Sequence, residues 1–229
     1  MEKQSMIINN ILSNDNLNRA YKQVVKNKGA AGIDGMECEA LFSHLRTNGA
    51  QLKESIRNQA YNPLPVKRVE IPKEDGSKRK LGIPTVTDRL VQQAVAQVLT
   101  PIYERIFHRN SYGFRPEKSA QQAVLKAVEY MNDGYNWVVD IDLEKFFDTV
   151  DHNKLISILN KEIKDGKVLS LIRKFLVSGV MVGEHMEETE IGTPQGGNLS
   201  PLLANIILNE LDWELEKRKL KFVRYADDC

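Results

Sequence analysis

The most informative segment of this sequence is KFVRYADDC, residues 221–229. Its side chains alternate as in a β-strand, with Phe222 and Arg224 on one face, and the strand runs into two adjacent aspartates, Asp227 and Asp228. Neighbouring carboxylates repel each other, so a chain that places them at the end of a buried strand needs a cation there, usually a divalent metal ion. Asp-Asp pairs also occur in surface turns without a ligand, so a metal site needs further carboxylates elsewhere in the chain.

The second candidate source of carboxylates is YNWVVDID, residues 135–142. Its alternation predicts a strand with Asp140 and Asp142 on one face. Asp142 is the preferred ligand because it is nearer the strand end; Asp140 is its rival, and a strand-end N-cap is the alternative role. A strand ending in Asp beside one ending in Asp-Asp brings together three carboxylates, which can hold two metal ions about 3.5–4 Å apart. Magnesium suits such a site because it needs few carboxylates and keeps positions for water and phosphate oxygens.

Composition places the chain among ordinary globular proteins, with 229 residues, 41% hydrophobic and 28% charged. The formal net charge of +1 does not by itself indicate a dedicated nucleic-acid-binding domain. Basic residues gather in segments 65–80 and 217–224, which matter only if they flank a catalytic centre. No apolar run reaches membrane-spanning length, the N-terminus lacks an export signal, and Cys38 and Cys229 form no CxxC motif. We therefore expect no membrane span, no zinc site and no disulfide framework, as in a reducing cytoplasm.

Turn and periodicity signals predict an α+β chain. Alternating residues on both sides of the Asp-Gly turn in EDGS predict a β-hairpin over residues 65–83. Residues 39–61 are predicted to form two helical pieces broken at Gly49, and Pro101 is predicted to kink or split a long helix capped by Asp88. Further helices are predicted at residues 14–27, 120–131, 152–161, 168–177 and from 200 onward.

Three segments, in this order, resemble motifs A, B and C of reverse transcriptases: DLEKFFD from Asp142, TPQGGNLSP from Thr193 and YADD from Tyr225. Three others resemble segments of the group II intron-encoded kind, bacterial retroelement enzymes that also act as splicing maturases: GAAGIDG from Gly29, RKLGIPT from Arg79 and SYGFRP from Ser111. The resemblance covers nearly the whole chain, and this many ordered motifs make a chance match improbable. Viral RNA-replicating polymerases, which typically carry GDD at motif C, fit less well.

The resemblance implies a two-magnesium site for nucleotidyl transfer. Asp142 and Asp227 would bind both Mg²⁺ ions, with Asp228 beside them and the Leu143 backbone carbonyl assisting. Metal bound there would activate the primer 3′-OH and neutralise charge on the incoming triphosphate.

The resemblance also implies a nucleotide pocket. Phe147 lies at the steric-gate position, where an aromatic ring excludes a 2′-OH and so favours DNA synthesis; a core phenylalanine is the alternative. Lys73 and Arg79 flank the hairpin turn and resemble residues that bind the triphosphate, Arg through bidentate contacts and Lys as a point charge. Lys67 is a further candidate for this pocket or for RNA. Without the family resemblance, these basic residues would be interpreted as solvent-exposed charges of the hairpin.

Template contacts are implied by the loops. Gln195 resembles the residue that contacts the nascent nucleotide, and Gly196 and Gly197 would let the backbone approach the template; a plain glycine turn before a helix is the alternative. Arg115 is a candidate for supporting the nucleotide pocket or binding the template. GAAGIDG would cover the template strand, or else only terminate the helix at 14–27.

The implied fold is α+β: the fingers and palm of a right-hand polymerase, with an antiparallel palm sheet packed against helices. Residues 1–45 would form an N-terminal extension with the template-lid loop, residues 46–134 mainly the fingers, and residues 135–229 the palm. The sequence ends one residue after YADD, so the outgoing motif C strand, the thumb and any endonuclease region are expected to be absent.

The implied function is that of an RNA-directed DNA polymerase of a bacterial group II intron, used in intron mobility, with intron RNA binding in splicing. The expected cofactor is Mg²⁺. The expected partners are group II intron RNA, an RNA template with a DNA primer, and deoxynucleoside triphosphates, with a homodimer left open. Without a thumb, processive synthesis is not expected, and whether these residues polymerise at all stays open. The alternatives are a splicing cofactor that binds RNA without polymerase activity, and a reverse transcriptase of a CRISPR-linked or defence system.

Overall fold

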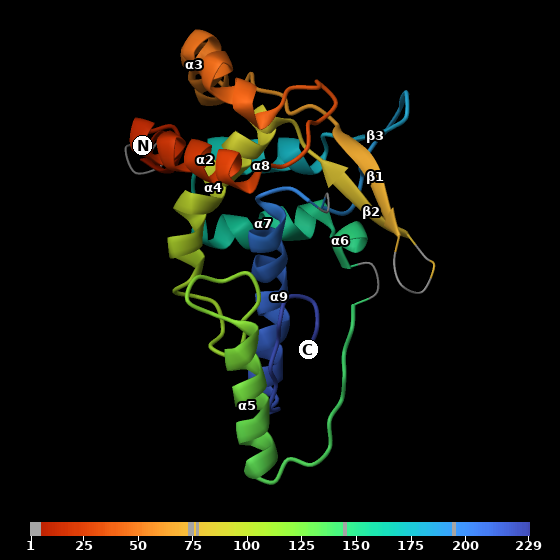
Figure 1. Ribbon diagram of the computed structural model, residues 1–229. Helices are drawn as coiled ribbons and strands as arrows, with labels where there is room; N and C mark the ends of the chain where they lie inside the picture. The colour runs from red at the N-terminus through yellow and green to blue at the C-terminus, as the bar shows by residue number, and fades with distance from the viewer. Residues whose placement is uncertain (1–5, 73–75, 77, 144–145, 194–195) are drawn as a thin grey trace. The chain divides into compact units, whose positions relative to one another are not determined.

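The computed structural model describes residues 6–72, 76, 78–143, 146–193 and 196–229 (Figure 1). They form two compact units: unit 1 is Met1–Leu99 with Phe147–Ser200, and unit 2 is Thr100–Phe146 with Pro201–Cys229. The predicted N-terminal extension, fingers and palm are functional regions rather than compact units, and their boundaries stay a prediction.

Unit 1 is mainly helical. Its helices are α1 (Met6–Ile11), α2 (Asn14–Asn27), the 3₁₀ turn η2 (Cys38–Ala40), α3 (Leu41–Arg57), α7 (His152–Glu162), α8 (Gly166–Leu176), most of α4 (Val86–Tyr103) and most of the short α6 (Phe146–Thr149). Their apolar faces form a buried core that includes Ile8, Leu90, Leu159 and Ile172. One buried carboxylate joins distant parts of this unit: Asp165 caps α8 and accepts a 3.0 Å hydrogen bond from the Ile8 N–H.

The sheet of unit 1 is mixed. Its strands are β1 (Val66–Pro72), β2 (Lys78–Ile83), β3 (Val180–Val182) and β4 (His185–Glu187), in the order β2-β1-β3-β4. The predicted hairpin over residues 65–83 is confirmed as the antiparallel pair β1–β2. The β3–β4 pair is also antiparallel, whereas β1 and β3 run parallel.

The helices α3 and α4 differ from the predictions in three details. α3 continues through Gly49, because one helical glycine costs only about 1 kcal/mol and burial of Leu41 and Ile56 stabilises the helix on both sides. α4 begins before Asp88: the Thr85 hydroxyl accepts a 3.1 Å hydrogen bond from the Asp88 N–H, which is the geometry of an N-cap. Pro101 lies inside α4 near its end and does not split it.

Unit 2 contains α5 (Ala120–Asn132), nearly all of α9 (Ser200–Lys217) and long extended segments. A capping box starts α5, in which Ser119 and Gln122 bond to each other's backbone. The predicted strand at residues 135–142 is not a strand in the structure, and Figure 1 draws it as a plain trace. The reason is the lack of a ladder: in the described residues of this segment, only Ile141 exchanges a reciprocal pair of backbone bonds, with Cys229, and Trp137 is 96% exposed.

The prediction of an antiparallel palm sheet is therefore not met in the described part of the chain. Among the residues of unit 2 that the structure describes, strand-like pairing is limited to that pair and to isolated bridges, Ser111 with Arg224 and Tyr225 with Asp228. The α+β class itself is confirmed by the mixed sheet and its helices.

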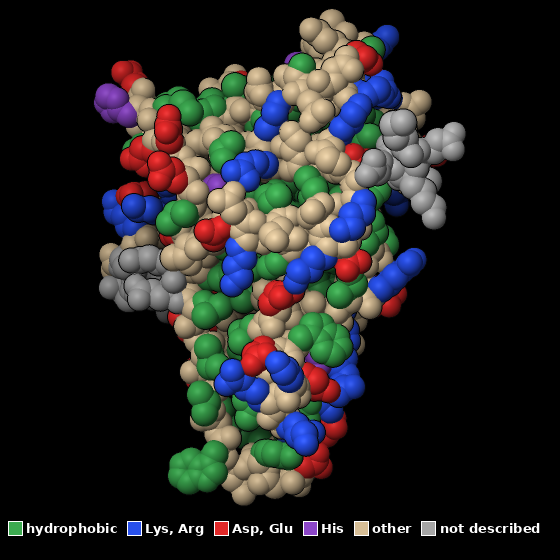
Figure 2. Space-filling view, turned by 180° about the vertical axis from the view of Figure 1, so that it is seen from behind, with side chains coloured by type: hydrophobic (Ala, Val, Ile, Leu, Met, Phe, Trp, Pro, Cys, Tyr) green, Lys and Arg blue, Asp and Glu red, His purple; other side chains and the backbone are tan. Residues whose placement is uncertain are grey.

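Hydrophobic side chains reach the surface among charged ones, as Figure 2 shows for one face. In α5 the exposed apolar residues follow a helical spacing, with Val124, Leu125, Val128 and Met131 between 43% and 68% exposed. None of the helices within the described ranges has both the length and the apolar character needed to cross a membrane.

Candidate active site

The YADD segment forms a tight turn in unit 2. The Tyr225 N–H donates to the Asp228 carbonyl at 2.9 Å, and the Asp228 N–H donates back to the Tyr225 carbonyl at 3.2 Å. Between them, Ala226 has a φ of +60°, in the left-handed region that costs a residue with a Cβ about 1–2 kcal/mol. The surrounding structure must hold this strained residue in place, and with it the adjacent Asp227.

The Asp142 segment lies beside this turn. The Ile141 N–H donates to the Cys229 carbonyl at 2.8 Å and the Cys229 N–H donates to the Ile141 carbonyl at 3.0 Å, which makes an antiparallel hydrogen-bonded pair. In antiparallel pairing, the next residue of one segment then lies opposite the previous residue of the other, so Asp142 faces Asp228 on one side of the pair. Asp142 and Asp228, 86 positions apart in the sequence, are thus placed opposite each other, although residues 135–142 do not form the predicted strand.

Neighbouring carboxylates act electrostatically on Asp228. The pKa of the Asp228 carboxyl lies above its usual range, because it loses hydration and because the negative charges of Asp227, Asp142 and Asp140 oppose its ionisation, in that order. Asp142 thus acts on Asp228 more strongly than Asp140 does, and the choice of Asp142 over Asp140 as the ligand stays a prediction.

The donor set suits magnesium in chemistry, because it consists of carboxylate oxygens. The side chains are not gathered for a metal: no three His, Cys, Asp or Glu side chains in the described part of the chain could together hold an ion. The Leu143 carbonyl accepts a 3.0 Å hydrogen bond from the Phe146 N–H, which leaves its second lone pair for another partner.

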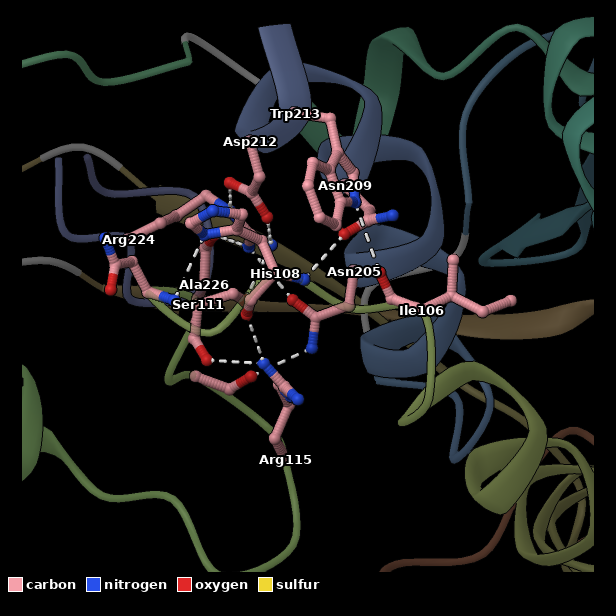
Figure 3. A network of polar contacts seen from close by, with 12 residues as sticks. Ile106, His108, Ser111, Arg115, Asn205, Asn209, Asp212, Trp213, Arg224 and Ala226 are labelled. Atoms are coloured by element: carbon pink, nitrogen blue, oxygen red, sulfur yellow. Dashed lines mark hydrogen bonds and ion pairs between the residues drawn. The ribbon is translucent and has the colours of Figure 1, made fainter. Parts of the chain in front are cut away.

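A buried polar network lies next to the turn, and sequence reasoning missed it (Figure 3). The Arg224 side chain is fully buried and forms an ion pair with the equally buried Asp212 of α9. Asn205, also on α9, and Ser111 accept further hydrogen bonds from the same guanidinium. The one signal in the sequence was an arginine sharing a face with Phe222 in a segment predicted to be a strand.

Arg115 belongs to the same region but not to an exposed surface. Its side chain is 5% exposed and pairs with Glu104 through several hydrogen bonds, the shortest 2.8 Å. Its Nη1 donates to the carbonyls of His108 and Ser111, at 2.7 and 2.8 Å. This placement does not support the predicted role in binding template. Through its bonds to the His108 and Ser111 carbonyls, Arg115 instead fixes the loop before α5.

Phe147 lies in unit 1, where it is half-buried and lines a cavity of about 430 Å³. Arg68 and Lys80, from β1 and β2, line the same cavity, as does the buried Thr193. The Phe147 carbonyl accepts a 2.6 Å hydrogen bond from the Thr193 N–H, so the start of the TPQGG loop is fixed to α6. The predicted gate residue therefore borders a pocket lined by these two basic side chains and by four acidic ones, Asp148, Glu187, Glu188 and Glu190.

Those basic residues are not the ones predicted. Cross-strand partners share a face, so the pairs Lys67–Ile83 and Ile71–Arg79 place Lys67 and Arg79 on one face of the hairpin. Arg68 and Lys80 lie on the other face, the one that lines the cavity. Lys73 and Gln195 lie outside the described residues, and their predicted roles stay predictions.

The glycines of two loops allow close contacts within unit 1. A Cβ on Gly196, whose φ is +115°, would lie 2.7 Å from the Gly82 carbonyl oxygen, and one on Gly197 would lie 2.7 Å from Gln92 Oε1. In GAAGIDG, a Cβ on Gly32 would lie 2.7 Å from the Thr85 backbone. The approach of Gly196 and Gly197 to a template, and the lid role of GAAGIDG, stay predictions.

Comparison with known proteins gives the family. Residues 71–229 match the family model described as "Reverse transcriptase (RNA-dependent DNA polymerase)". The chain is 42% identical over 210 residues to the group II intron-encoded protein LtrA of Lactococcus lactis subsp. cremoris, a match that covers 91% of this chain and 35% of LtrA. It is 39% identical over 211 residues to protein YkfC of Escherichia coli K12, covering 89% of this chain and 55% of YkfC. The chain thus spans about a third to about half of the length of these relatives.

A solved structure supports the same fold. A chain of a partial Cas6-RT-Cas1–Cas2 complex matches with a TM-score of 0.63 and 28% identity, covering 96% of this chain and 37% of that one. The family match extends over the TPQGG and YADD segments, and the relatives extend it to the N-terminal residues. On this evidence the chain belongs to the reverse transcriptase family and carries a reverse-transcriptase domain of the group II intron-encoded type.

Proposed function

We propose that this chain carries the catalytic part of an RNA-directed DNA polymerase that serves a group II intron. The observation that carries the proposal is the antiparallel pair Ile141–Cys229, which sets Asp142 opposite Asp228 beside Asp227 in a chain of the reverse transcriptase family. Paired carboxylates from two segments are the protein's contribution to two-metal phosphoryl chemistry.

Each carboxylate has a role in this proposal. Asp142 and Asp227 hold two Mg²⁺ ions, with Asp228 beside them and the Leu143 carbonyl as an additional oxygen donor. Bound magnesium supplies activation of the primer 3′-OH and charge neutralisation on the incoming triphosphate.

The nucleotide pocket is the cavity beside Phe147. Its ring excludes a ribose 2′-OH, while Arg68 and Lys80 offer positive charge to the phosphates. Lys73 and Gln195 complete the pocket as the motifs imply. Arg79 and Lys67, on the face of the hairpin away from this cavity, contact the triphosphate and the template from outside it, and Gly196 and Gly197 contact the template. Arg115 acts only indirectly, through the loop that it braces.

The larger organisation follows from the same family. Residues 1–45 act as an N-terminal extension, residues 46–134 mainly as fingers and residues 135–229 as palm of a right-hand polymerase. The substrates are an RNA template with a DNA primer and deoxynucleoside triphosphates, and the RNA partner is the intron in a bacterial cytoplasm. LtrA is named as a group II intron-encoded protein, which makes intron RNA the first partner to test.

The test is primer extension on an RNA template with magnesium, comparing the unmodified chain with Asp142→Asn, Asp140→Asn and Asp227→Ala. Synthesis should be abolished by Asp142→Asn and Asp227→Ala, retained by Asp140→Asn, and lost when the metal is chelated. Synthesis that is unaffected by Asp227→Ala would contradict the site assignment.

The second candidate function is binding of intron RNA in splicing without polymerisation. A relative named as an intron maturase, nuclear intron maturase 2 of Arabidopsis thaliana, favours it as a companion activity. Intron RNA binding that persists in Asp227→Ala while synthesis is lost supports both roles. Binding without synthesis in the unmodified chain supports the splicing role alone.

A further inference from the structure

Arg224 is a buried cation with every donor satisfied. Its Nε and Nη2 donate to the two carboxylate oxygens of Asp212 at 2.7 and 2.6 Å, the bidentate geometry that suits a guanidinium. Nη2 also donates to the Ser111 hydroxyl at 2.7 Å, and Nη1 donates to Asn205 Oδ1 at 2.9 Å. The fifth N–H, on Nη1, donates to the Ala226 carbonyl at 2.7 Å.

That last bond joins the network to the YADD turn. Ala226 is the strained residue with a positive φ, and its carbonyl belongs to the peptide that leads into Asp227. The backbone of Arg224 is fixed as well: its N–H donates to the Asn110 carbonyl at 2.9 Å, and its carbonyl accepts from the Tyr112 N–H at 2.8 Å. Tyr225, the first residue of the turn, is thus anchored on both sides: Arg224 before it through main-chain hydrogen bonds, and Ala226 after it through the Arg224 guanidinium.

The loop under the turn is part of the same arrangement. Gly113 approaches so closely that a Cβ there would lie 2.2 Å from the Ala226 nitrogen. The Asn205 Nδ2 donates to the Gly113 carbonyl at 2.8 Å, so one side chain of α9 holds both Arg224 and the loop. Figure 3 shows these side chains converging from α9, the loop at residues 106–115 and the segment before the turn.

Stability alone does not account for such a network. A buried ion pair seldom stabilises a fold more than well-packed hydrophobic residues of similar volume, because desolvation offsets the attraction. Hydrophobic residues, however, could not hold the Ala226 carbonyl. The network is therefore best explained by its hydrogen bond to the Ala226 carbonyl, which fixes the YADD turn.

We propose that Arg224 is a positioning residue, and that the Asp212–Arg224 pair fixes the Tyr225–Asp228 turn in the strained conformation that presents Asp227 and Asp228. The inference rests on the proposed function only for the purpose of those carboxylates. It predicts that Arg224 acts on the divalent-ion site without touching the ion.

The test compares three forms of the full chain. Arg224→Lys keeps the charge but cannot make the bidentate contact together with the Ala226 bond. The double substitution Arg224→Met with Asp212→Leu removes the network but replaces the ion pair with apolar volume, so that the fold is retained. Arg109→Lys is the matched control, since Arg109 forms an exposed ion pair with Glu216 in the same unit.

Two readouts are needed, besides urea unfolding as a check of folding. Mn²⁺ binding, measured by electron paramagnetic resonance, should weaken about 10–100-fold in Arg224→Lys and in the double variant, the usual effect of losing a group that orients a ligand. The amide resonances of Ala226, Asp227 and Asp228 in metal-free protein should shift in both variants. Arg109→Lys should change neither quantity.

The possible results separate the inference from the proposed function. A folded double variant with unchanged resonances, or with the Mn²⁺ affinity of the unmodified chain, overturns the positioning role. Asp227→Ala, measured in parallel, tests the metal assignment: if it binds Mn²⁺ normally, the proposed function fails. If Asp227→Ala loses Mn²⁺ and the double variant keeps it, only the positioning role fails.

Discussion

Replacing Gly113 with alanine should move the YADD turn and so test the geometry of the site. The added Cβ would lie 2.2 Å from the Ala226 nitrogen, 2.9 Å from the Ala226 Cα and 3.0 Å from the Tyr225 carbonyl carbon. All three are backbone atoms, so no side chain can swing aside. Since non-bonded carbon contacts settle near 3.5–4.0 Å, the loop and the turn must separate by about 1 Å.

The movement should lower both the free energy of unfolding and the primer-extension activity. Forcing extra volume into a packed site costs about 1–3 kcal/mol of unfolding free energy. The main-chain bonds of Arg224 to Asn110 and Tyr112 lie beside the strained contact and should lengthen. A displacement of catalytic groups by about 1 Å can lower the rate about 100-fold. The rate of primer extension should therefore fall by a much larger factor than the folded fraction of the protein.

The assay pairs urea unfolding with steady-state primer extension, and Gly166→Ala is the matched control. Gly166 is the first residue of α8, and a Cβ there meets no atom within 4 Å, so its unfolding free energy should change by less than about 0.5 kcal/mol. If Gly113→Ala behaves like Gly166→Ala in both measurements, the close approach of loop and turn is wrong.

Three further predictions concern unit 1. Gly49→Ala should raise the unfolding free energy by about 0.5–1 kcal/mol in urea titrations, because alanine is the better residue inside a continuous α3. Burial raises the pKa of Asp88 despite its bonds to Thr85 and Tyr61; the folded state therefore holds this proton more tightly, and stability should fall as pH rises above the unfolded pKa of about 3.9. Asp88→Asn should flatten that slope, as measured by unfolding at a series of pH values. Phe147→Ala should raise ribonucleotide use relative to deoxynucleotide use by about tenfold or more in single-nucleotide kcat/KM measurements, and an unchanged ratio would remove Phe147 as the gate.

Local patterns predicted what depends on local chemistry. The Asp-Gly turn between alternating segments is sufficient to specify the β1–β2 hairpin, including which side chains share a face. The proximity of Asp142 and Asp228 was expected from two adjoining strands, and the structure instead pairs their segments through Ile141 and Cys229 alone. What failed was the strand at residues 135–142: alternation describes a segment that can pair, and pairing depends on a partner that the segment itself does not encode.

The surroundings of two arginines were likewise not predictable from the local sequence. Arg115 and Arg224 both stand beside family motifs, and the sequence suggested an exposed role for the first and only a strand face for the second. Each is buried against a carboxylate, Glu104 or Asp212, whose identity as partner is set by tertiary packing. Likewise, Arg68 and Lys80 line the cavity in place of Lys67 and Arg79 because their face of the hairpin is the one that lies toward residues 187–193.

The charge of Arg224 explains why the carboxylates remain available for a metal. Its guanidinium is neutralised by Asp212, and all its donors are used, so it holds the turn without compensating Asp227 or Asp228. Those two and Asp142 repel one another, as the raised pKa of Asp228 shows, and within the described ranges no Lys or Arg forms an ion pair with them. A cation paired directly with Asp227 or Asp228 would have relieved the repulsion but occupied the site. By pairing Arg224 with a separate buried acid, the fold fixes the backbone of the turn and leaves its negative charge to be balanced from outside, which is the electrostatic condition for binding magnesium together with a triphosphate.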